Sequence, residues 1–286
     1  MKRSGVFLFF IVALCVWAGN AHALVIETNE WSNRTQTGWI YTQGKPNIDS
    51  SVTSPSGGST LRFDYTAGTY TDASTSGGKA EFGNLTGRDL YVGHWVKWSS
   101  NWVWHSVGSK IDYQWIAVPS FTTGQNACFT IHILPDGRTV VLTSNISGNG
   151  VFSSLPHDYR VTLPSAFQFN RWYWIEYHVR LNDVTADLNP PTFANVVPNG
   201  LIEFWVDDIL RLTRTDVRFT DRVNQSWKTI LHSPEWGGGN PGGIIPEPGI
   251  SLWVDHTVIS TTRIGRPGGT SSDTTAPATP AGWIVQ

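Results

Sequence analysis

The sequence predicts an all-β protein in which antiparallel strands form two sheets packed face to face. Few windows repeat apolar residues with a helical period, whereas short alternating runs rich in Val, Ile, Thr and aromatic residues recur along the chain. Residues that favour turns separate these runs, because the chain contains 28 Gly and 16 Pro. Without helices to cover it, each sheet must bury one face against another sheet, which indicates a sandwich or jelly roll.

Residues 1–23 are expected to be a secretory signal peptide. Lys2 and Arg3 precede an apolar run at residues 6–18, and the small-residue sequence Ala-His-Ala ends at Ala23. The apolar run is shorter than the roughly 20 residues that a membrane-spanning helix needs, and no later segment is as apolar. We therefore expect a protein without a membrane span, secreted to the periplasm or the extracellular space.

The composition of the mature chain excludes several classes of protein. Removing the first 23 of the 286 residues leaves 263, enough for one large β domain with a full core. Cys15 leaves with the signal peptide, so Cys128 can form neither an internal disulfide nor a cysteine-based metal cluster. With 18 basic against 22 acidic residues, the mature chain has a formal charge of −4, which argues against binding to nucleic acid. We expect a monomer.

About a dozen strands are predicted in the domain at residues 24–265. The clearest are residues 61–65, 90–98, 113–118, 128–134, 139–144, 159–163, 172–182, 201–212, 228–232 and 251–260. Pro135-Asp136-Gly137 joins two of them as a hairpin turn, because Pro and Asp favour the bend and Gly accepts positive φ. Residues 266–286 are rich in Pro, Gly, Ser and Thr, which predicts a flexible tail.

The strand at residues 172–182 has two unlike faces. Read with a period of two, one face is an apolar core stripe, and the other carries Trp172, Trp174, Glu176, His178 and Arg180. Indoles on a polar face are typical of a surface that stacks on sugar rings, so this face is a candidate ligand groove. Alternatively, Trp172 packs at the rim of the sheet, and Glu176 and Arg180 form a cross-strand ladder with Glu203 and Asp207.

Several stretches, taken in order, resemble one family of enzymes. They are LRFDYTAGTYTDASTSGGKAEF, LYVGHWVKWSSNWVWHSVGSKIDYQW, FNRWYWIEYHVRLN, NGLIEFWVDDILRLTRTDVRF and EWGGGNPGGIIPEPGISLWVDHTVIS, which together cover roughly residues 60–265. They are similar to the jelly-roll polysaccharide lyases of families fourteen and twenty, the alginate and glucuronan lyases. The resemblance implies a concanavalin A-like β-jelly roll and a polysaccharide as the partner.

The same resemblance implies β-elimination, in which a cation or amide neutralises a uronate carboxylate and a base removes the proton from C5. The lysine of the family's Gly-x-Lys is Lys110, and CFTIHI falls where the family has Ser-x-Arg, so Thr130 and His132 are the counterparts. The chain departs from the family in the next strand, where Val141 and Thr143 replace tyrosines. An imidazole is then the natural proton acceptor.

The predicted catalytic residues are Lys110, Gln114 and His132, with Lys110 or Gln114 neutralising the carboxylate. If the strand is continuous, Lys110, Asp112 and Gln114 share a face. The alternative for Lys110 is a solvated ion pair with Asp112. The predicted substrate-binding residues are Thr130, His178, Trp174, Glu176 and Arg180. We expect Lys110, Gln114, His132 and His178 to converge on one concave face.

No cofactor is expected from the sequence, although Asp207-Asp208 and Asp255-His256 could hold a structural calcium ion. Neither the G-x-S-x-G motif of hydrolases nor the E-x-D-x-x-E motif of retaining glucanases is present. Three hypotheses remain: a lyase-like enzyme acting on an acidic polysaccharide, a non-catalytic lectin-like carbohydrate-binding module, and a structural or adhesive protein that binds no sugar.

Overall fold

The computed structural model describes residues 25–29, 31, 39–42, 46–68, 79–83, 85–116, 127–145, 158–188, 193–237, 244–245 and 247–268. The predicted signal peptide lies outside these residues, as does the predicted tail beyond Gly268. Within the described part of the chain, no helix is both long enough and apolar enough to cross a membrane.

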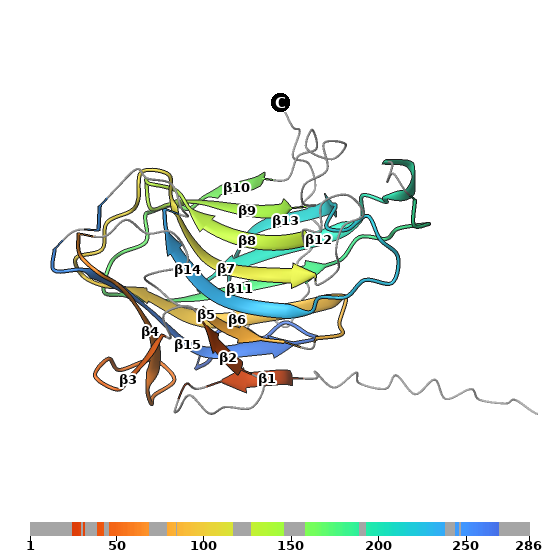
Figure 1. Ribbon diagram of the computed structural model, residues 1–286. Helices are drawn as coiled ribbons and strands as arrows, with labels where there is room; N and C mark the ends of the chain where they lie inside the picture. The colour runs from red at the N-terminus through yellow and green to blue at the C-terminus, as the bar shows by residue number, and fades with distance from the viewer. Residues whose placement is uncertain are drawn as a thin grey trace, which may run out of the picture.

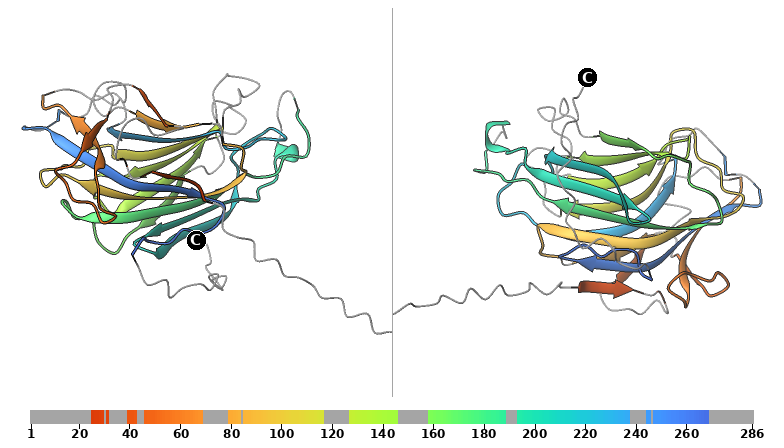
Figure 2. Two further views of the ribbon diagram at one scale, coloured as in Figure 1. Left: turned by 90° about the horizontal axis from the view of Figure 1, so that it is seen from below. Right: turned by 180° about the vertical axis from the view of Figure 1, so that it is seen from behind.

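The described strands form two antiparallel sheets, as predicted. Sheet A contains, in order, β13 (Ile209–Val217), β12 (Gly200–Val206), β11 (Trp172–Arg180), β6 (Asp89–Trp98), β15 (Ile250–Ser260), β4 (Thr60–Tyr65) and β3 (Asn47–Asp49), with β1 (Val25–Asn29) also paired to β15. Sheet B contains, in order, β10 (Asp158–Thr162), β9 (Thr139–Asn145), β8 (Ala127–Ile133), β7 (Ser109–Ile116), β14 (Thr229–Trp236), β5 (Lys79–Phe82) and β2 (Trp39–Thr42). Sheet B faces the viewer in Figure 1, and sheet A does so in the right-hand view of Figure 2.

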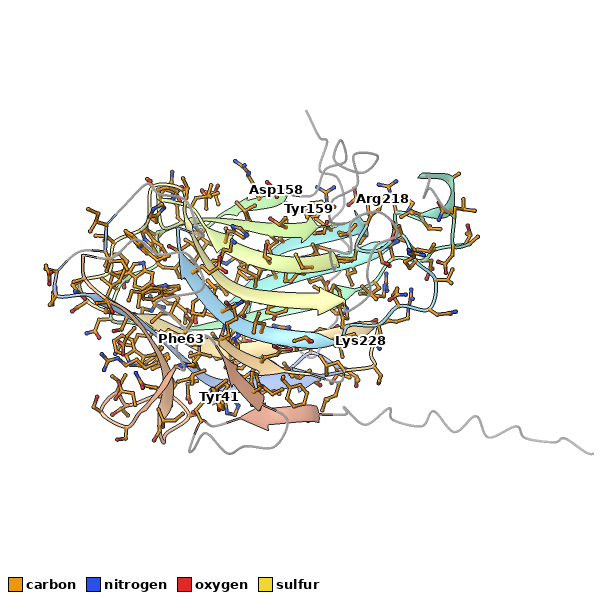
Figure 3. The ribbon with its side chains drawn as sticks, in the orientation of Figure 1. Tyr41, Phe63, Asp158, Tyr159, Arg218 and Lys228 are labelled. Carbon is orange, nitrogen blue, oxygen red and sulfur yellow. The ribbon has the colours of Figure 1, made fainter. Side chains whose placement is uncertain are left out.

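The hydrophobic core lies between the two sheets because each strand turns its apolar side chains inward. In β11 the predicted core stripe is confirmed, since Tyr173, Ile175, Tyr177 and Val179 are all buried. Aromatic rings of the two sheets contact each other directly. For example, the ring centroid of Phe129 on β8 lies 5.3 Å from that of Tyr177 on β11. The core extends across the width of the sandwich and includes both Phe63 on β4 and Tyr159 on β10, which lie far apart in Figure 3.

Most predicted strands are present, but several differ from the prediction in their bounds. Residues 201–212 form parts of two strands, β12 and β13, because Asp207 and Asp208 adopt positive φ angles of 51° and 65° and reverse the chain. Asp tolerates this left-handed conformation better than most residues other than Gly and Asn. β14 continues to Trp236, beyond the predicted end at His232, because a bulge accommodates Pro234 within the strand. The short strands β1, β2, β3 and β5 were not among the predicted segments.

Gly93 on β6 allows an indole to lie flat on the outer surface of sheet A. A Cβ atom added to Gly93 would be 2.3 Å from Cζ2 of Trp174, which is fully buried on the neighbouring strand β11. The glycine therefore creates the space that the Trp174 ring fills.

Gly93→Ala is expected to lower the free energy of unfolding by about 1–3 kcal/mol, because the new methyl group would displace the Trp174 ring. Gly83→Ala is the matched control, since a Cβ atom at Gly83 would meet nothing within 4 Å. The control should change stability by less than about 0.5 kcal/mol. Urea unfolding of the two variants measures the difference, and equal stabilities would contradict the close packing described here.

Candidate functional site

A β-bulge in β7 decides which polar side chains face outward from sheet B. Lys110 pairs with His132 of β8, but Asp112 pairs with Ile131, because the register shifts between them. Ile131 belongs to the core, so Asp112 is buried between the sheets, whereas Lys110 lies beside His132 on the outer face. The prediction that Lys110 and Asp112 share a face was therefore wrong. The backbone of Gln114 pairs with Phe129, and the side chain of Gln114 lies outside the described residues.

The outer face of sheet B carries a compact set of polar groups. The ammonium group of Lys110 lies 2.8 Å from Oε2 of Glu235 on β14, so its ion-pair partner is Glu235 and not Asp112. On β8, Nε2 of His132 lies 2.7 Å from the hydroxyl of Thr130. Three of the predicted site residues, Lys110, His132 and Thr130, are thus brought to one face.

The imidazole of His132 is held in its neutral form at neutral pH. Burial lowers the pKa of His132 to about 4, and the positive charge of Lys110 acts in the same direction, while Asp158 opposes it. A neutral ring can accept a proton, but a pKa this low makes it a weaker base than an ordinary histidine.

Strand β9, which pairs with β8, places no second acid or base beside His132. Val141 of β9 pairs with His132, and Thr143 pairs with Thr130. The hydroxyl of Thr143 donates a hydrogen bond of 2.9 Å to Asp158. These are the positions at which the lyases that the chain resembles carry tyrosines.

Residues 261–268, which follow β15 and are called the strap below, lie against part of the outer face of sheet A. The carboxylate of Glu176 accepts hydrogen bonds from the backbone N–H groups of Ile264 and Gly265 at 2.8 and 3.0 Å. The guanidinium group of Arg263 lies 5.1 Å above the ring of Trp205. Glu176 and Trp174 are both fully buried, so the prediction that they line an open ligand groove was wrong.

His178, also on the outer face of sheet A, is enclosed by protein groups. Its ring stacks on Tyr91 at 3.9 Å, and its two nitrogens lie 2.5 Å from Asp89 and 2.8 Å from Glu203. Burial disfavours the charged ring, but the hydrogen bonds to Asp89 and Glu203 outweigh this and raise the pKa of His178. Glu203 therefore does form a cross-strand contact, with His178 as the partner.

The expected convergence of His178 with Lys110 and His132 was wrong. His178, Trp174, Glu176 and Arg180 lie on β11 of sheet A, whereas Lys110 and His132 lie on the opposite outer face of the sandwich. Arg180 is exposed and donates a hydrogen bond of 3.4 Å to the carbonyl of Asn199. The two faces are separated by the whole hydrophobic core.

The acidic pair proposed for calcium is already bonded to protein groups. Asp207 accepts a hydrogen bond of 3.0 Å from the backbone N–H of Trp174 and lies 3.1 Å from Arg171. Asp208 accepts one of 2.8 Å from the backbone N–H of Arg266. Calcium binding stays a prediction.

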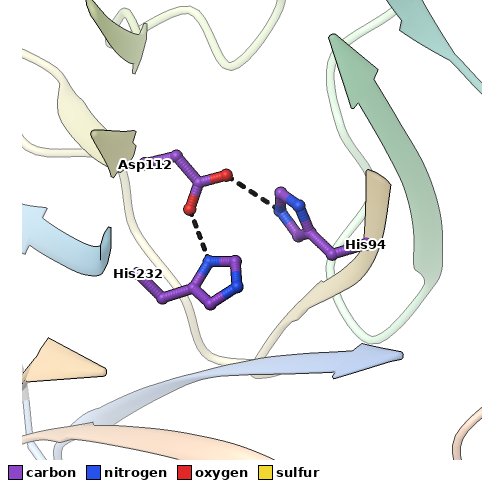
Figure 4. Close-up of side chains that lie close together, drawn as sticks. All are labelled: His94, Asp112 and His232. Atoms are coloured by element: carbon purple, nitrogen blue, oxygen red, sulfur yellow. Dashed lines mark hydrogen bonds and ion pairs between the residues drawn. The ribbon is translucent and has the colours of Figure 1, made fainter. Parts of the chain in front are cut away.

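Three ionisable side chains meet in the interior, and sequence reasoning missed them as a group. His94 of β6, Asp112 of β7 and His232 of β14 are fully buried between the sheets (Figure 4). Nδ1 of His232 lies 2.7 Å from one carboxylate oxygen of Asp112, and Nε2 of His94 lies 3.3 Å from the other. Burial lowers the pKa of His94 to about 4. The sequence did contain a signal. His94 lies two positions from each of the apolar residues Val92 and Val96, so it shares their face of the strand, which is the core face.

Comparisons with known proteins confirm the fold. The sequence matches no protein-family model and no curated protein. Among solved structures, the chain is similar to endo-β-1,4-glucuronan lyase from the fungus Trichoderma reesei, with a TM-score of 0.58 and 14% identity over 84% of this chain and 96% of that one. It is also similar to alginate lyase vAL-1 from Chlorella virus, with a TM-score of 0.57 and 14% identity over 82% and 99% of the two chains.

A third similar structure is the marine PL-14 alginate lyase from Aplysia kurodai, with a TM-score of 0.54 and 14% identity over 75% of this chain and 86% of that one. At this identity the likeness establishes a shared architecture. The chain therefore has the jelly-roll fold of these polysaccharide lyases, as the sequence predicted.

His178→Gln is expected to remove a pH-dependent part of the stability. Because the folded pKa of His178 is raised above 6.5, its contribution is complete below that pH and is lost as the pH rises through the folded pKa. The variant should be less stable by about 1 kcal/mol near pH 5.5 and by less near pH 9, since Asp89 is half exposed and water screens that partner.

Urea unfolding of wild type and His178→Gln at both pH values measures this effect. Arg180→Gln on the same strand is the control, because arginine keeps its charge across this range and its loss should have a similar effect at both pH values. If His178→Gln lowers the free energy of unfolding equally at both pH values, the raised pKa of His178 is contradicted.

Proposed function

We propose that this chain is an exported polysaccharide lyase that cleaves a uronate-containing polysaccharide by β-elimination on the outer face of sheet B. The observation that carries the proposal is the pairing of Lys110 with His132 across β7 and β8, which brings an ammonium group beside a neutral imidazole. The shared fold with a glucuronan lyase and alginate lyases supports this substrate class. Export rests on the signal peptide expected at residues 1–23.

In the proposed reaction, Lys110 binds the uronate carboxylate and stabilises the negative charge that develops when C5 loses its proton. His132 accepts that proton at its unprotonated ring nitrogen, and the hydroxyl of Thr130 orients the ring. The electron pair of the C5–H bond forms the C4=C5 double bond as the C4–O bond breaks. The proton now on His132 can pass to the departing oxygen, so a single imidazole acts first as the base and then as the acid.

Glu235 reduces the positive charge that this face presents to an acidic polymer. Its carboxylate partly neutralises Lys110 at a distance of 2.8 Å, so an incoming uronate must share the ammonium group with it. The Lys110 side chain is still about a quarter exposed, so solvent reaches part of it. We therefore expect moderate affinity per sugar, with binding spread along several sugars of the chain.

A second candidate function is a carbohydrate-binding module without catalysis. Val141 and Thr143 favour it, because β9 offers neither a base nor an acid next to His132. The pKa of about 4 for His132 favours it as well, since a weak base removes a carbon-bound proton slowly. In this case Lys110 would still bind uronate carboxylates.

The test is incubation of the mature protein with alginate, glucuronan and other uronate polymers, followed by the ultraviolet absorbance of the unsaturated product. Lys110→Ala and His132→Ala are each expected to lower the rate about 100-fold or more, because each removes a group that acts in the transition state. Lys97→Ala is the control, since Lys97 lies on the outer face of sheet A. Its rate should equal that of wild type.

Affinity electrophoresis in gels containing the same polymers separates the two candidates. Retention without unsaturated product, weakened by Lys110→Ala, would favour the binding module over the lyase. Neither product nor retention with any uronate polymer would contradict both.

A further inference from the structure

We propose that His94, Asp112 and His232 form a buried binding site for a divalent transition-metal ion of the zinc class, which joins the two sheets from within. The three side chains come from strands far apart in the sequence: β6 in sheet A and β7 and β14 in sheet B. Figure 4 shows the carboxylate of Asp112 between the two imidazoles. An ion held here would be an internal cross-link between the sheets.

The spacing of the donor atoms suits one small ion. Nε2 of His94 lies 3.3 Å from Oδ2 of Asp112, and one donor atom from each of the three residues lies within 4.8 Å of the others. Zinc binds nitrogen and oxygen at about 2.0–2.2 Å, so neighbouring ligands in its tetrahedral shell are about 3.3 Å apart. Any wider separation among the three donor atoms would have to shorten to complete a three-residue set.

Unsatisfied polar atoms point to a missing partner at this place. Within the described part of the chain, Nδ1 of His94 has no hydrogen-bond partner, and the 3.3 Å contact between Nε2 of His94 and Oδ2 of Asp112 lacks the geometry of a hydrogen bond, although all three atoms are fully buried. Each unpaired buried polar group costs about 1–3 kcal/mol. A cation coordinated by Nε2 of His94 and Oδ2 of Asp112 would satisfy both atoms at once.

The surroundings of His232 match those of a metal-bound histidine. Its Nε2 lies 2.8 Å from the hydroxyl of Thr257 on β15, and the ring of Trp39 stacks parallel to it at 5.6 Å. If Nδ1 binds the ion, Nε2 carries the proton and donates it to Thr257, which is the outer hydrogen bond that metal-bound histidines usually make. Thr257 and Trp39 would then fix the orientation of the ligand.

The donor set favours one class of ion. Two imidazole nitrogens and one carboxylate oxygen suit zinc and neighbouring transition metals, whereas calcium requires six or more oxygen ligands. Because all three side chains are fully buried, the ion would enter during folding. Without an ion, the hydrogen bond between Asp112 and His232 remains, but within the described residues Nδ1 of His94 is left without a hydrogen bond.

The test uses the mature protein, unfolded in guanidinium with a chelator, freed of metal, and refolded with or without zinc. We expect one zinc per chain after extensive dialysis, measured by inductively coupled plasma mass spectrometry, and a Tm several degrees higher than that of the zinc-free sample. Refolding with cobalt should give the absorption bands of tetrahedral or five-coordinate Co²⁺. A zinc content far below one per chain together with an unchanged Tm would overturn the proposal.

Variants locate the bound ion. His94→Leu fills the same core space and removes the unsatisfied nitrogens, and Asp112→Asn removes the charge, so both should lose stoichiometric zinc and the zinc-dependent rise in Tm. His256→Asn is the control, because His256 lies outside the triad and Asn tolerates its positive φ of 46°. If the control loses zinc while His94→Leu retains it, the ion binds elsewhere. If the core variants do not fold, the zinc dependence of wild-type refolding decides the question.

Discussion

The burial of one face of each sheet against the other is the constraint from which the placement of every polar group follows. Because side chains alternate along a strand, each polar residue lies either in the shared core or on one of two outer faces. His132 and His178 are both outward-facing, yet they lie on opposite sides of the sandwich because β8 and β11 belong to different sheets. A single bulge in β7 then separates Lys110 on the outer face from Asp112 in the core.

The fold and its core stripes could be predicted from the sequence, because alternation and turn residues report directly on burial. The site could be predicted only in part. Lys110 and Asp112 are two positions apart and look like residues of one face, and nothing in the letters SKIDYQW indicates that the register shifts between them. The indoles of β11 also misled the prediction, because the strap binds Glu176 through backbone N–H groups that carry no sequence signal.

The polar residues of the protein therefore fall into three sets with different chemistry. The outer face of sheet B holds Lys110 and His132, which are partly exposed to solvent. The outer face of sheet A holds His178, whose two ring nitrogens contact two carboxylates. The interior holds His94 and Asp112, where burial makes each unsatisfied atom costly.

The strap also determines how the molecule can be attached to a support. Its contacts with Glu176 and Asp208 keep residues 264–266 against sheet A, on the side of the sandwich turned away from Lys110. A bead, electrode or fusion partner coupled through a linker just after Gly268 would thus leave the Lys110 face directed toward the bulk solution. Coupling at β1, which pairs with β15 at the border of sheet A, would leave the same face open.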